Sequence, residues 1–267
     1  MDLQLTGKRA LITGGSRGIG KAVARALALE GVDVALLARN ARALDSAAEE
    51  LGAQSGRRVV AVVADTTNDD QVRLAVAHAV QLLGGPIDIL VNAAAEPAGY
   101  AAPPKLAQIR EADFHSEMDT KVMGYIRCAR EVAPGMCTQG WGRIVNISGL
   151  GARQTGNTLG SIRNVAVTAL TKNLADELGP HGVNVTVVHP GTTRTERTAA
   201  LVAARALAQG TSAQAVEAEI AAGNSIRHLV DASEVADVVA FLCSPRSIAI
   251  QGDVIAAGGG APRSIHC

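Results

Sequence analysis

A glycine-rich segment near the N-terminus has the residue types and spacing that bind a phosphate. The sequence Thr13-Gly14-Gly15-Ser16-Arg17-Gly18-Ile19-Gly20 follows a short apolar run and opens a stretch with helical spacing. Glycines in such a turn let the backbone approach a pyrophosphate, and the free N–H groups of a helix N-terminus bind negative charge. The motif alone also fits an ordinary tight turn. Its place between a first strand and a first helix favours dinucleotide binding.

Two arginines indicate which dinucleotide the chain prefers. The second apolar run ends in Leu37-Ala38-Arg39-Asn40, at the point where an acidic residue would bind a ribose 2′-hydroxyl. Arg39 stands there instead, and Arg17 lies inside the glycine loop. A guanidinium group presents a fork of donors that suits a 2′-phosphate. We therefore expect NADP(H), with NAD(H) as the alternative if both arginines are only solvated surface residues.

The elements that position these residues alternate between short strands and longer helices. We predict strands over 9–13, 32–37, 59–63, 87–91, 142–147, 183–188 and 253–256. We predict helices over 19–30, 41–51, 69–83, 113–136, 162–178, 195–223 and 233–243. This alternation is typical of a parallel sheet, and no linker or repeat divides the chain. The sequence therefore predicts one α/β domain over 1–267, a Rossmann-type doubly wound parallel sheet with helices on both faces.

Composition excludes several classes of function. Lys and Arg number 25 and Asp and Glu number 25, so the chain has no net charge to attract nucleic acid or an anionic membrane. The four cysteines lack metal-ligand spacing, as do the histidines, so we expect no metal site. We find no apolar run of about 18 residues and no signal-peptide pattern at the N-terminus. We expect a cytoplasmic protein that acts on a small molecule.

The chain resembles the short-chain dehydrogenase/reductase family over nearly its whole length. Its glycine loop matches the glycine motif of that family, and Asp65 follows the third strand like the residue that contacts adenine. Asn92-Ala93-Ala94-Ala95 resembles the family segment Asn-Asn-Ala-Gly. Pro190-Gly191 and Thr195 resemble the loop that covers the nicotinamide, and Gly258-Gly259 resembles the C-terminal signature.

The glycine loop, the two arginines and this resemblance together define the expected cofactor site. Its residues are Gly14, Ser16, Arg17, Gly18, Ile19, Gly20, Arg39, Asn40, Asp65, Thr66, Asn92, Ala93, Ala94, Asn164, Pro190, Gly191, Thr193 and Thr195.

The catalytic positions implied by the resemblance depart from the family pattern. The family uses an Asn, a Ser, and a Tyr followed four residues later by a Lys; the Tyr exchanges a proton with the substrate oxygen. Ser148 matches the serine. Aligning Leu170-Thr171 with the family places Gly160 at the Tyr position and Asn164 at the Lys position, and no tyrosine follows Ser148. Lys121 stands where the family has Asn.

Two functional hypotheses follow from these departures. The resemblance implies an NAD(P)(H)-dependent oxidoreductase for a ketone or secondary alcohol. In this hypothesis Ser148 polarises the carbonyl, Lys121 acts as an acid or places a positive charge near the oxyanion, and Asn164 donates to the ribose hydroxyls. The alternative is a catalytically inactive homologue that binds the cofactor as a sensor or partner subunit. Tyr125 follows Lys121 by one helical turn. It either forms a Tyr–Lys pair there or packs in a helix interface.

The substrate and the assembly are expected only in outline. The resemblance places the substrate under a segment near 194–224, and Glu96, Tyr100 and Ser161 are further candidates to contact it. It also implies a homodimer or homotetramer, formed through the predicted helices 113–136 and 162–178. The Ala- and Val-rich sequence of 165–174 suits such an interface.

Overall fold

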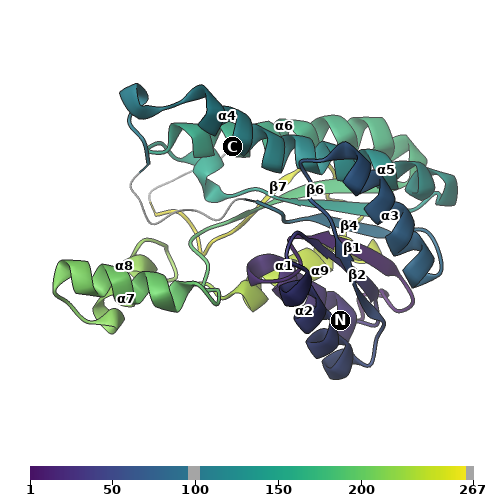
Figure 1. The fold of residues 1–267 in the computed structure, drawn as a ribbon, viewed down its shortest axis with the longest axis horizontal. Helices are drawn as coiled ribbons and strands as arrows, with labels where there is room; N and C mark the ends of the chain where they lie inside the picture. Colours follow the sequence, from purple (N-terminus) through teal and green to yellow (C-terminus); the bar gives the residue numbers. More distant parts are fainter. Residues whose placement is uncertain (96–102, 263–267) are drawn as a thin grey trace.

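The computed structural model describes residues 1–95 and 103–262, which form a seven-stranded parallel sheet with the order β3-β2-β1-β4-β5-β6-β7 (Figure 1). The strands are β1 Arg9–Thr13, β2 Asp33–Ala38, β3 Val59–Val63, β4 Ile89–Asn92, β5 Gly142–Ile147, β6 Val183–Pro190 and β7 Val254–Ala257. The strand order reverses between β1 and β4, and ligands of such sheets bind beyond the carboxyl ends of the strands at this point. The predicted Rossmann-type α/β fold is confirmed.

Helices cover both faces of the sheet (Figure 1). On one face, α1 (Gly18–Leu29), α2 (Ala41–Ser55) and α9 (Ala232–Cys243) bury aliphatic residues against the strands. On the other face, α3 (Asp69–Leu83), α5 (Gly124–Gln139) and α6 (Thr158–Leu178) do the same. The close packing of Ala and Val side chains on both faces is what a parallel sheet buried on two sides requires. None of the described helices is long and apolar enough to cross a membrane.

The predicted helix 113–136 is not one regular α-helix. It consists of α4 (Glu111–Glu117), a π-helical segment over Met118–Met123, and then α5. A π-helix bonds each N–H five residues back rather than four, and such wide turns are rare and often lie at functional sites. The segment carries Thr120 and Lys121, both buried. Lys121 and Tyr125 were expected to share a face only if this helix were regular, and the π-helical segment shows that it is not.

The segment predicted as one helix over 195–223 is a helical hairpin. Helix α7 (Thr198–Gln209) ends at Gly210, which has a left-handed φ of 64°, and α8 (Ala213–Ala222) begins after Ser212. The Ser212 side chain caps α8 by accepting from the N–H of Ala215. The two helices bury a small cluster of their own and project from the rest of the molecule (Figure 1). We call residues 194–224 the arm.

A chain of buried amides ties together the elements beneath the carboxyl edge of the sheet. Asn92 at the end of β4 donates from Nδ2 to Oδ1 of Asn146 in β5 at 2.9 Å. Asn146 in turn donates from Nδ2 to Oγ1 of Thr171 in α6 at 3.0 Å. All three side chains are fully buried. Removing the middle member would therefore leave buried polar groups without their partners.

The substitution Asn146→Ala tests this network. We expect it to lower the free energy of unfolding by about 1–3 kcal/mol, the usual range for buried polar groups left unpaired. Urea denaturation measures the change. The control is Asn173→Ala, which removes an exposed amide of α6 that donates to Ala169 O within its own helix. It should change stability by less than about 0.5 kcal/mol. Equal effects of the two substitutions would contradict the structural role of the network.

Candidate cofactor and active site

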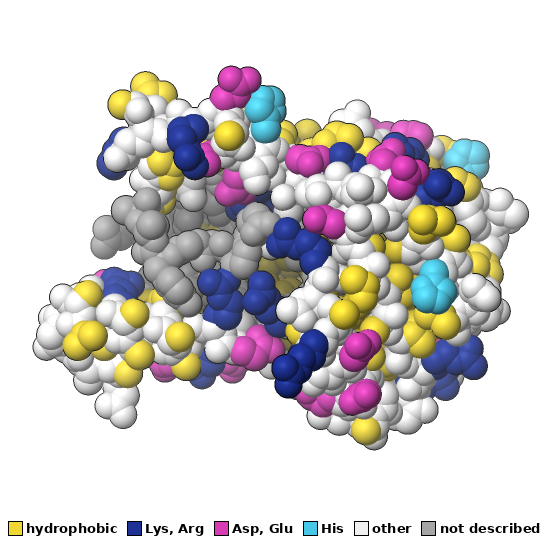
Figure 2. All heavy atoms as spheres, viewed as in Figure 1, with side chains coloured by type: hydrophobic (Ala, Val, Ile, Leu, Met, Phe, Trp, Pro, Cys, Tyr) yellow, Lys and Arg dark blue, Asp and Glu magenta, His cyan; other side chains and the backbone are white. Residues whose placement is uncertain are grey.

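A cavity of about 1030 Å³ runs along the carboxyl edge of the sheet, between the body of the protein and the arm. Figure 2 shows Lys and Arg side chains gathered beside the hollow between these two parts. The residues of the expected site that line the cavity come from seven separate parts of the chain. They are Gly14, Ser16, Arg17, Gly18, Ile19, Gly20, Arg39, Asn40, Asp65, Thr66, Ala93, Ala94, Lys121, Ser148, Pro190, Gly191, Thr193 and Thr195.

Two residues of the expected site do not line the cavity. Asn92 is fully buried in the amide network beneath the sheet edge, and Asn164 is buried behind Ser148. The side chain of Asn164 lies against the backbone of Gly149 and Gly151, where a methyl group on either glycine would meet Nδ2 at 3.1 Å. Both side chains are thus held by protein partners beside the cavity lining, and their contact with a cofactor stays a prediction.

The glycine loop presents a helix N-terminus to the cavity. A side chain on Gly20 would overlap the carbonyl of Gly14, so only glycine permits this close turn. Gly18 has a left-handed φ of 58°. Within the described chain, the Arg17 side chain does not cap α1, and its first turn carries no acidic residue. N–H groups at a helix start bind an anion, and the Gly18 N–H here donates to Oε2 of Glu196 at 3.0 Å. This helix end therefore accepts negative charge, which fits a pyrophosphate.

The end of β2 forms the wall next to this loop. Arg39 and Asn40 are exposed there and line the cavity, close to the segment that holds Asp65. Asn40 also caps α2, because its Oδ1 accepts from the N–H of Ala43 at 2.9 Å. The Asp65 carboxylate bonds Thr67 at its N–H and at Oγ1, which fixes it against its own turn. Arg39 thus stands on a wall where hydrogen bonds already hold the Asn40 amide and the Asp65 carboxylate in place.

Lys121 brings a positive charge to the opposite end of the cavity. Its side chain is only 4% exposed, and Nζ donates to the carbonyl oxygen of Ser148 at 2.9 Å and to Oδ1 of Asn164 at 3.3 Å. An ammonium group has three N–H donors, and the described residues provide acceptors for two of them. Because Lys121 lines the cavity, the third donor is the one that a substrate can use.

Burial lowers the pKa of Lys121 to about 7, from an ordinary value of 10.5. The positive charge of Arg163 lowers the pKa further, whereas Glu117 opposes this effect. Arg163 and Glu117 form an ion pair that joins α6 to the end of α4. A group with a pKa close to neutrality can both give and take a proton at physiological pH, as general acid–base catalysis requires.

Ser148, Asn164 and Lys121 form one cluster from three elements. Ser148 directly follows β5, and its Oγ donates to the backbone carbonyl of Asn164 at 3.0 Å. Asn164 stands at the position assigned to the family lysine, and Lys121 stands at the position assigned to the family asparagine. The two side chains bond each other across the cluster. The amine is therefore delivered from the π-helical segment instead of from α6.

Gly160 lies in the first turn of α6, which begins at Thr158 and not at residue 162 as predicted. Asn157 causes the earlier start, because its Oδ1 accepts from the N–H of Gly160 at 2.9 Å. Among the described residues, Asn157 and Gln154 line the cavity on this side, and Gly160 does not. Sequence reasoning missed both amides. An Asn three residues before the family Tyr position is a recognisable helix cap, and it could have revealed Asn157.

The other candidate residues have structural surroundings. Tyr125 is buried, its hydroxyl donates to the carbonyl of Ile147 at 2.9 Å, and burial raises its pKa. Of the two alternatives for Tyr125, a Tyr–Lys pair or packing in the interior, the structure agrees with packing, because Tyr125 is absent from the described cavity lining. The Ser161 hydroxyl donates to Gln154 O. Glu96 and Tyr100 lie outside the described residues.

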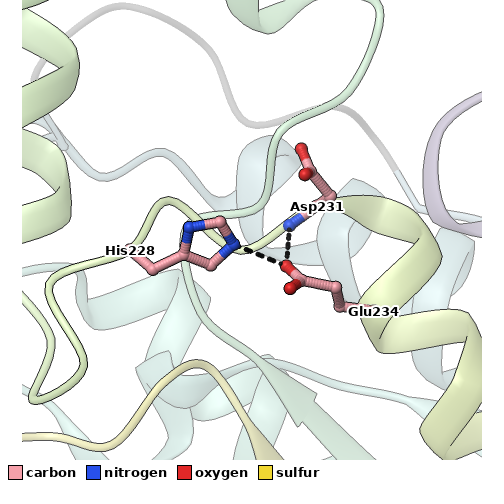
Figure 3. Close-up of side chains that lie close together, drawn as sticks. All are labelled: His228, Asp231 and Glu234. Carbon is pink, nitrogen blue, oxygen red and sulfur yellow. Dashed lines mark hydrogen bonds and ion pairs between the residues drawn. The ribbon is translucent and has the colours of Figure 1, made fainter.

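His228, Asp231 and Glu234 meet at the start of α9, with one potential ligand atom from each within 4.8 Å of the others (Figure 3). Sequence spacing gave no sign of this grouping. Glu234 Oε2 accepts from the N–H of Asp231 at 2.7 Å and lies 2.8 Å from Nε2 of His228. The bond from Asp231 N–H to Glu234 is one half of a capping box that closes the N-terminus of α9, and His228 contacts the same carboxylate. The grouping is explained by helix capping and carries no metal assignment.

Comparisons with known proteins agree with this geometry. The model of the short chain dehydrogenase family matches residues 8–206. Oxidoreductase UcpA of Salmonella typhimurium is 34% identical over 270 residues, covering 98% of each chain. The crystal structure of L-sorbose reductase from Gluconobacter frateurii with NADPH and L-sorbose has a TM-score of 0.91 and 28% identity, covering 99% of this chain and 100% of the other. NAD⁺-bound xylitol dehydrogenase has a TM-score of 0.86 and 27% identity, covering 96% and 100%.

The fold and the cavity define a Rossmann-type dinucleotide-binding protein. The match over most of its length places the chain more closely: it belongs to the short-chain dehydrogenase family.

The titration of Lys121 makes stability depend on pH in a specific direction. Its pKa is about 7 in the folded protein and 10.5 ordinarily, so between these values the unfolded chain binds more protons and folding stability rises with pH. The slope is about 1.4 kcal/mol per pH unit. From pH 7 to pH 9, urea denaturation should show the wild type gaining about 2 kcal/mol relative to Lys121→Met.

The matched control for this experiment is Lys172→Met. Lys172 is an exposed lysine of α6 that pairs with Asp176. The difference in stability between wild type and this control should not change over the same pH range. If the difference in unfolding free energy between Lys121→Met and the wild type stays constant from pH 7 to pH 9, Lys121 stays charged in the folded protein.

Proposed function

We propose that the protein is an NADP(H)-dependent oxidoreductase that interconverts a ketone and a secondary alcohol, with Lys121 as the acid–base group in place of a tyrosine. The observation that carries the proposal is the buried Lys121 amine, held between Ser148 O and Asn164 Oδ1 at the wall of the cavity. The family membership supports the reaction class, and the relatives include structures with NADPH and with NAD⁺.

The cofactor would lie along the carboxyl edge of the sheet. The start of α1 would hold the pyrophosphate, and Arg17 and Arg39 would bind the 2′-phosphate through their guanidinium groups. Pro190, Gly191 and the threonines that follow would cover the nicotinamide. When bound, the cofactor supplies or accepts the hydride at the substrate carbon. NAD(H) remains the alternative if the arginines do not contact a phosphate.

The protein's own contribution is to stabilise and protonate the substrate oxygen. In the reductive direction, the Lys121 ammonium donates the proton that its third N–H carries while the carbonyl becomes an alcohol, and the neutral amine is then reprotonated from solvent. The Ser148 hydroxyl lies beside Lys121 and can donate to the same oxygen by turning from Asn164 O. Asn164 orients Lys121 instead of contacting the ribose, because it lies behind the cavity wall.

The substrate would occupy the end of the cavity under the arm. Leu201, Ile220 and Asn224 of the arm line this end together with Gln154 and Asn157. This wall combines aliphatic surface with amide groups, which suits a neutral carbonyl compound with further polar groups.

The helices next to this end also suggest self-association. Met123, Ile162 and Val165 are between 40% and 50% exposed on the predicted interface helices. Apolar side chains at this exposure support a homodimer or homotetramer.

The second candidate function is a cofactor-binding protein without turnover. The specific observation in its favour is that Ser148 Oγ is already bonded to Asn164 O and that glycine stands at the family Tyr position. Such a protein would bind the dinucleotide through the same residues and would signal its occupancy. Kinetics separates the two functions, because loss of a general acid typically costs about 10²–10⁴ in rate without removing the binding site.

Cofactor preference is tested by titrating the protein with NADPH and NADH and following cofactor fluorescence. We expect tighter binding of NADPH. Arg39→Ala should weaken NADPH binding by about 10- to 100-fold, the value of a charge-assisted hydrogen bond of roughly 1.5–3 kcal/mol, and leave NADH binding unchanged. Arg42→Ala is the control, because Arg42 is exposed on α2 and is not among the described lining residues. Failure of either nucleotide to bind would overturn the proposed cofactor site.

Catalysis is tested by Lys121→Met in a reductase assay over a panel of ketones. We expect kcat to fall by about 10²–10⁴ while the Kd for NADPH stays the same. Because the protonated amine acts in reduction, wild-type kcat/KM should fall with rising pH above about 7, and the variant should lose this dependence. Lys172→Met should behave as wild type. NADPH binding without turnover by the wild type would favour the second function, and full activity of Lys121→Met would exclude Lys121 as the acid.

A further inference from the structure

Glu196 of the arm occupies the helix end that a cofactor pyrophosphate needs. Its Oε2 accepts from the backbone N–H of Gly18, the first residue of α1, at 3.0 Å. The two residues are 178 positions apart in the chain. Within the described chain, α1 receives no cap from the Arg17 side chain and has no acidic residue in its first turn. Glu196 therefore supplies the negative charge that this helix start otherwise lacks.

The contact belongs to a segment that rests directly on the glycine loop. A methyl group on Gly18 would meet Cγ2 of Thr195 at 3.7 Å, which is ordinary van der Waals contact. The segment is braced internally, because Thr198 Oγ1 accepts from the N–H of Thr195 at 2.9 Å. Thr198 is the first residue of α7. Glu196 therefore lies in a segment, Thr195 to Thr198, that connects the glycine loop to the start of the arm.

A carboxylate and a pyrophosphate compete for this position. Both are anions that accept hydrogen bonds from N–H groups at the positive end of the helix dipole. The N–H of Gly18 cannot serve both at full strength, and two negative groups in contact repel each other. Binding of a dinucleotide at the proposed cofactor site therefore requires the Glu196 carboxylate to leave.

We propose that Glu196 is an intramolecular latch that closes the pyrophosphate position in the free protein, and that cofactor binding releases it together with the start of the arm. This inference rests on the proposed function, because it takes the cavity to be a dinucleotide site. The latch couples the two ligand positions, because the arm residues Leu201 and Ile220 line the same cavity as the glycine loop.

The substitution Glu196→Gln keeps the shape of the side chain and removes its charge. A carboxylate at a helix N-terminus contributes about 0.3–2 kcal/mol, so the Kd should decrease by about 2- to 30-fold. The factor should be the same for NADPH and NADH, since both carry the pyrophosphate. Fluorescence titration measures both. Glu219→Gln is the matched control: it removes an exposed arm carboxylate that pairs with Arg205, away from Gly18, and should not change either Kd.

Amide hydrogen exchange of the cofactor-free protein tests the contact separately. The Gly18 amide should exchange slowly in the wild type and in Glu219→Gln, and faster in Glu196→Ala, which removes the acceptor. Failure of the wild type and Glu196→Gln to bind any nucleotide would overturn the cofactor site. Binding by both with an unchanged or increased Kd in Glu196→Gln would overturn the latch alone, as would unchanged Gly18 exchange in Glu196→Ala.

Discussion

The desolvated amine of Lys121 is the constraint around which the reactive end of the cavity is built. A charge removed from water is costly unless other groups hold it, and here a backbone carbonyl and an amide oxygen do so. The carbonyl belongs to Ser148, immediately after β5, so the amine is fixed to the sheet itself. Tyr125 donates to the preceding carbonyl, that of Ile147, which fastens the same stretch of helix one turn further on.

Lys121 and Asn164 depend on each other. Their side-chain atoms are 3.3 Å apart, so a lysine at position 164 beside the present Lys121 would place two ammonium groups in contact. Like charges at this distance disfavour each other strongly in a buried setting. An asparagine at 164 accepts from the Lys121 amine without adding a second positive charge. In the proposed function, Lys121 and Asn164 act as one exchanged pair, with the positive charge supplied from the π-helical segment.

The sequence predicted the sheet well because parallel strands leave a direct signature. The runs Arg9–Thr13 and Val59–Val63 are apolar, short and bounded by turn residues, and both strands have these bounds. The π-helical turn around Lys121 leaves no such signature, because it differs from an α-helix in its backbone hydrogen bonds and not in a pattern of side chains. The orientation of Asn164 also leaves no sequence signal, because it depends on how α6 packs behind Ser148. The capping residues Asn157 and Ser212 did carry signals for the start of α6 and the break in the arm.

Positively charged side chains line the cavity from one end to the other. Arg17, Arg39 and Lys121 line it from the glycine loop to Ser148, and the helix start between them adds partial positive charge. Such a surface is most stable when an anion lies on it. In the free protein, Glu196 provides that anion at the helix start, from an arm that otherwise projects away from the body. Replacing this carboxylate by a phosphate exchanges one negative charge for another at the same N–H. In the proposed latch, the electrostatic gain from the cofactor is therefore smaller than the charge of the cavity alone suggests.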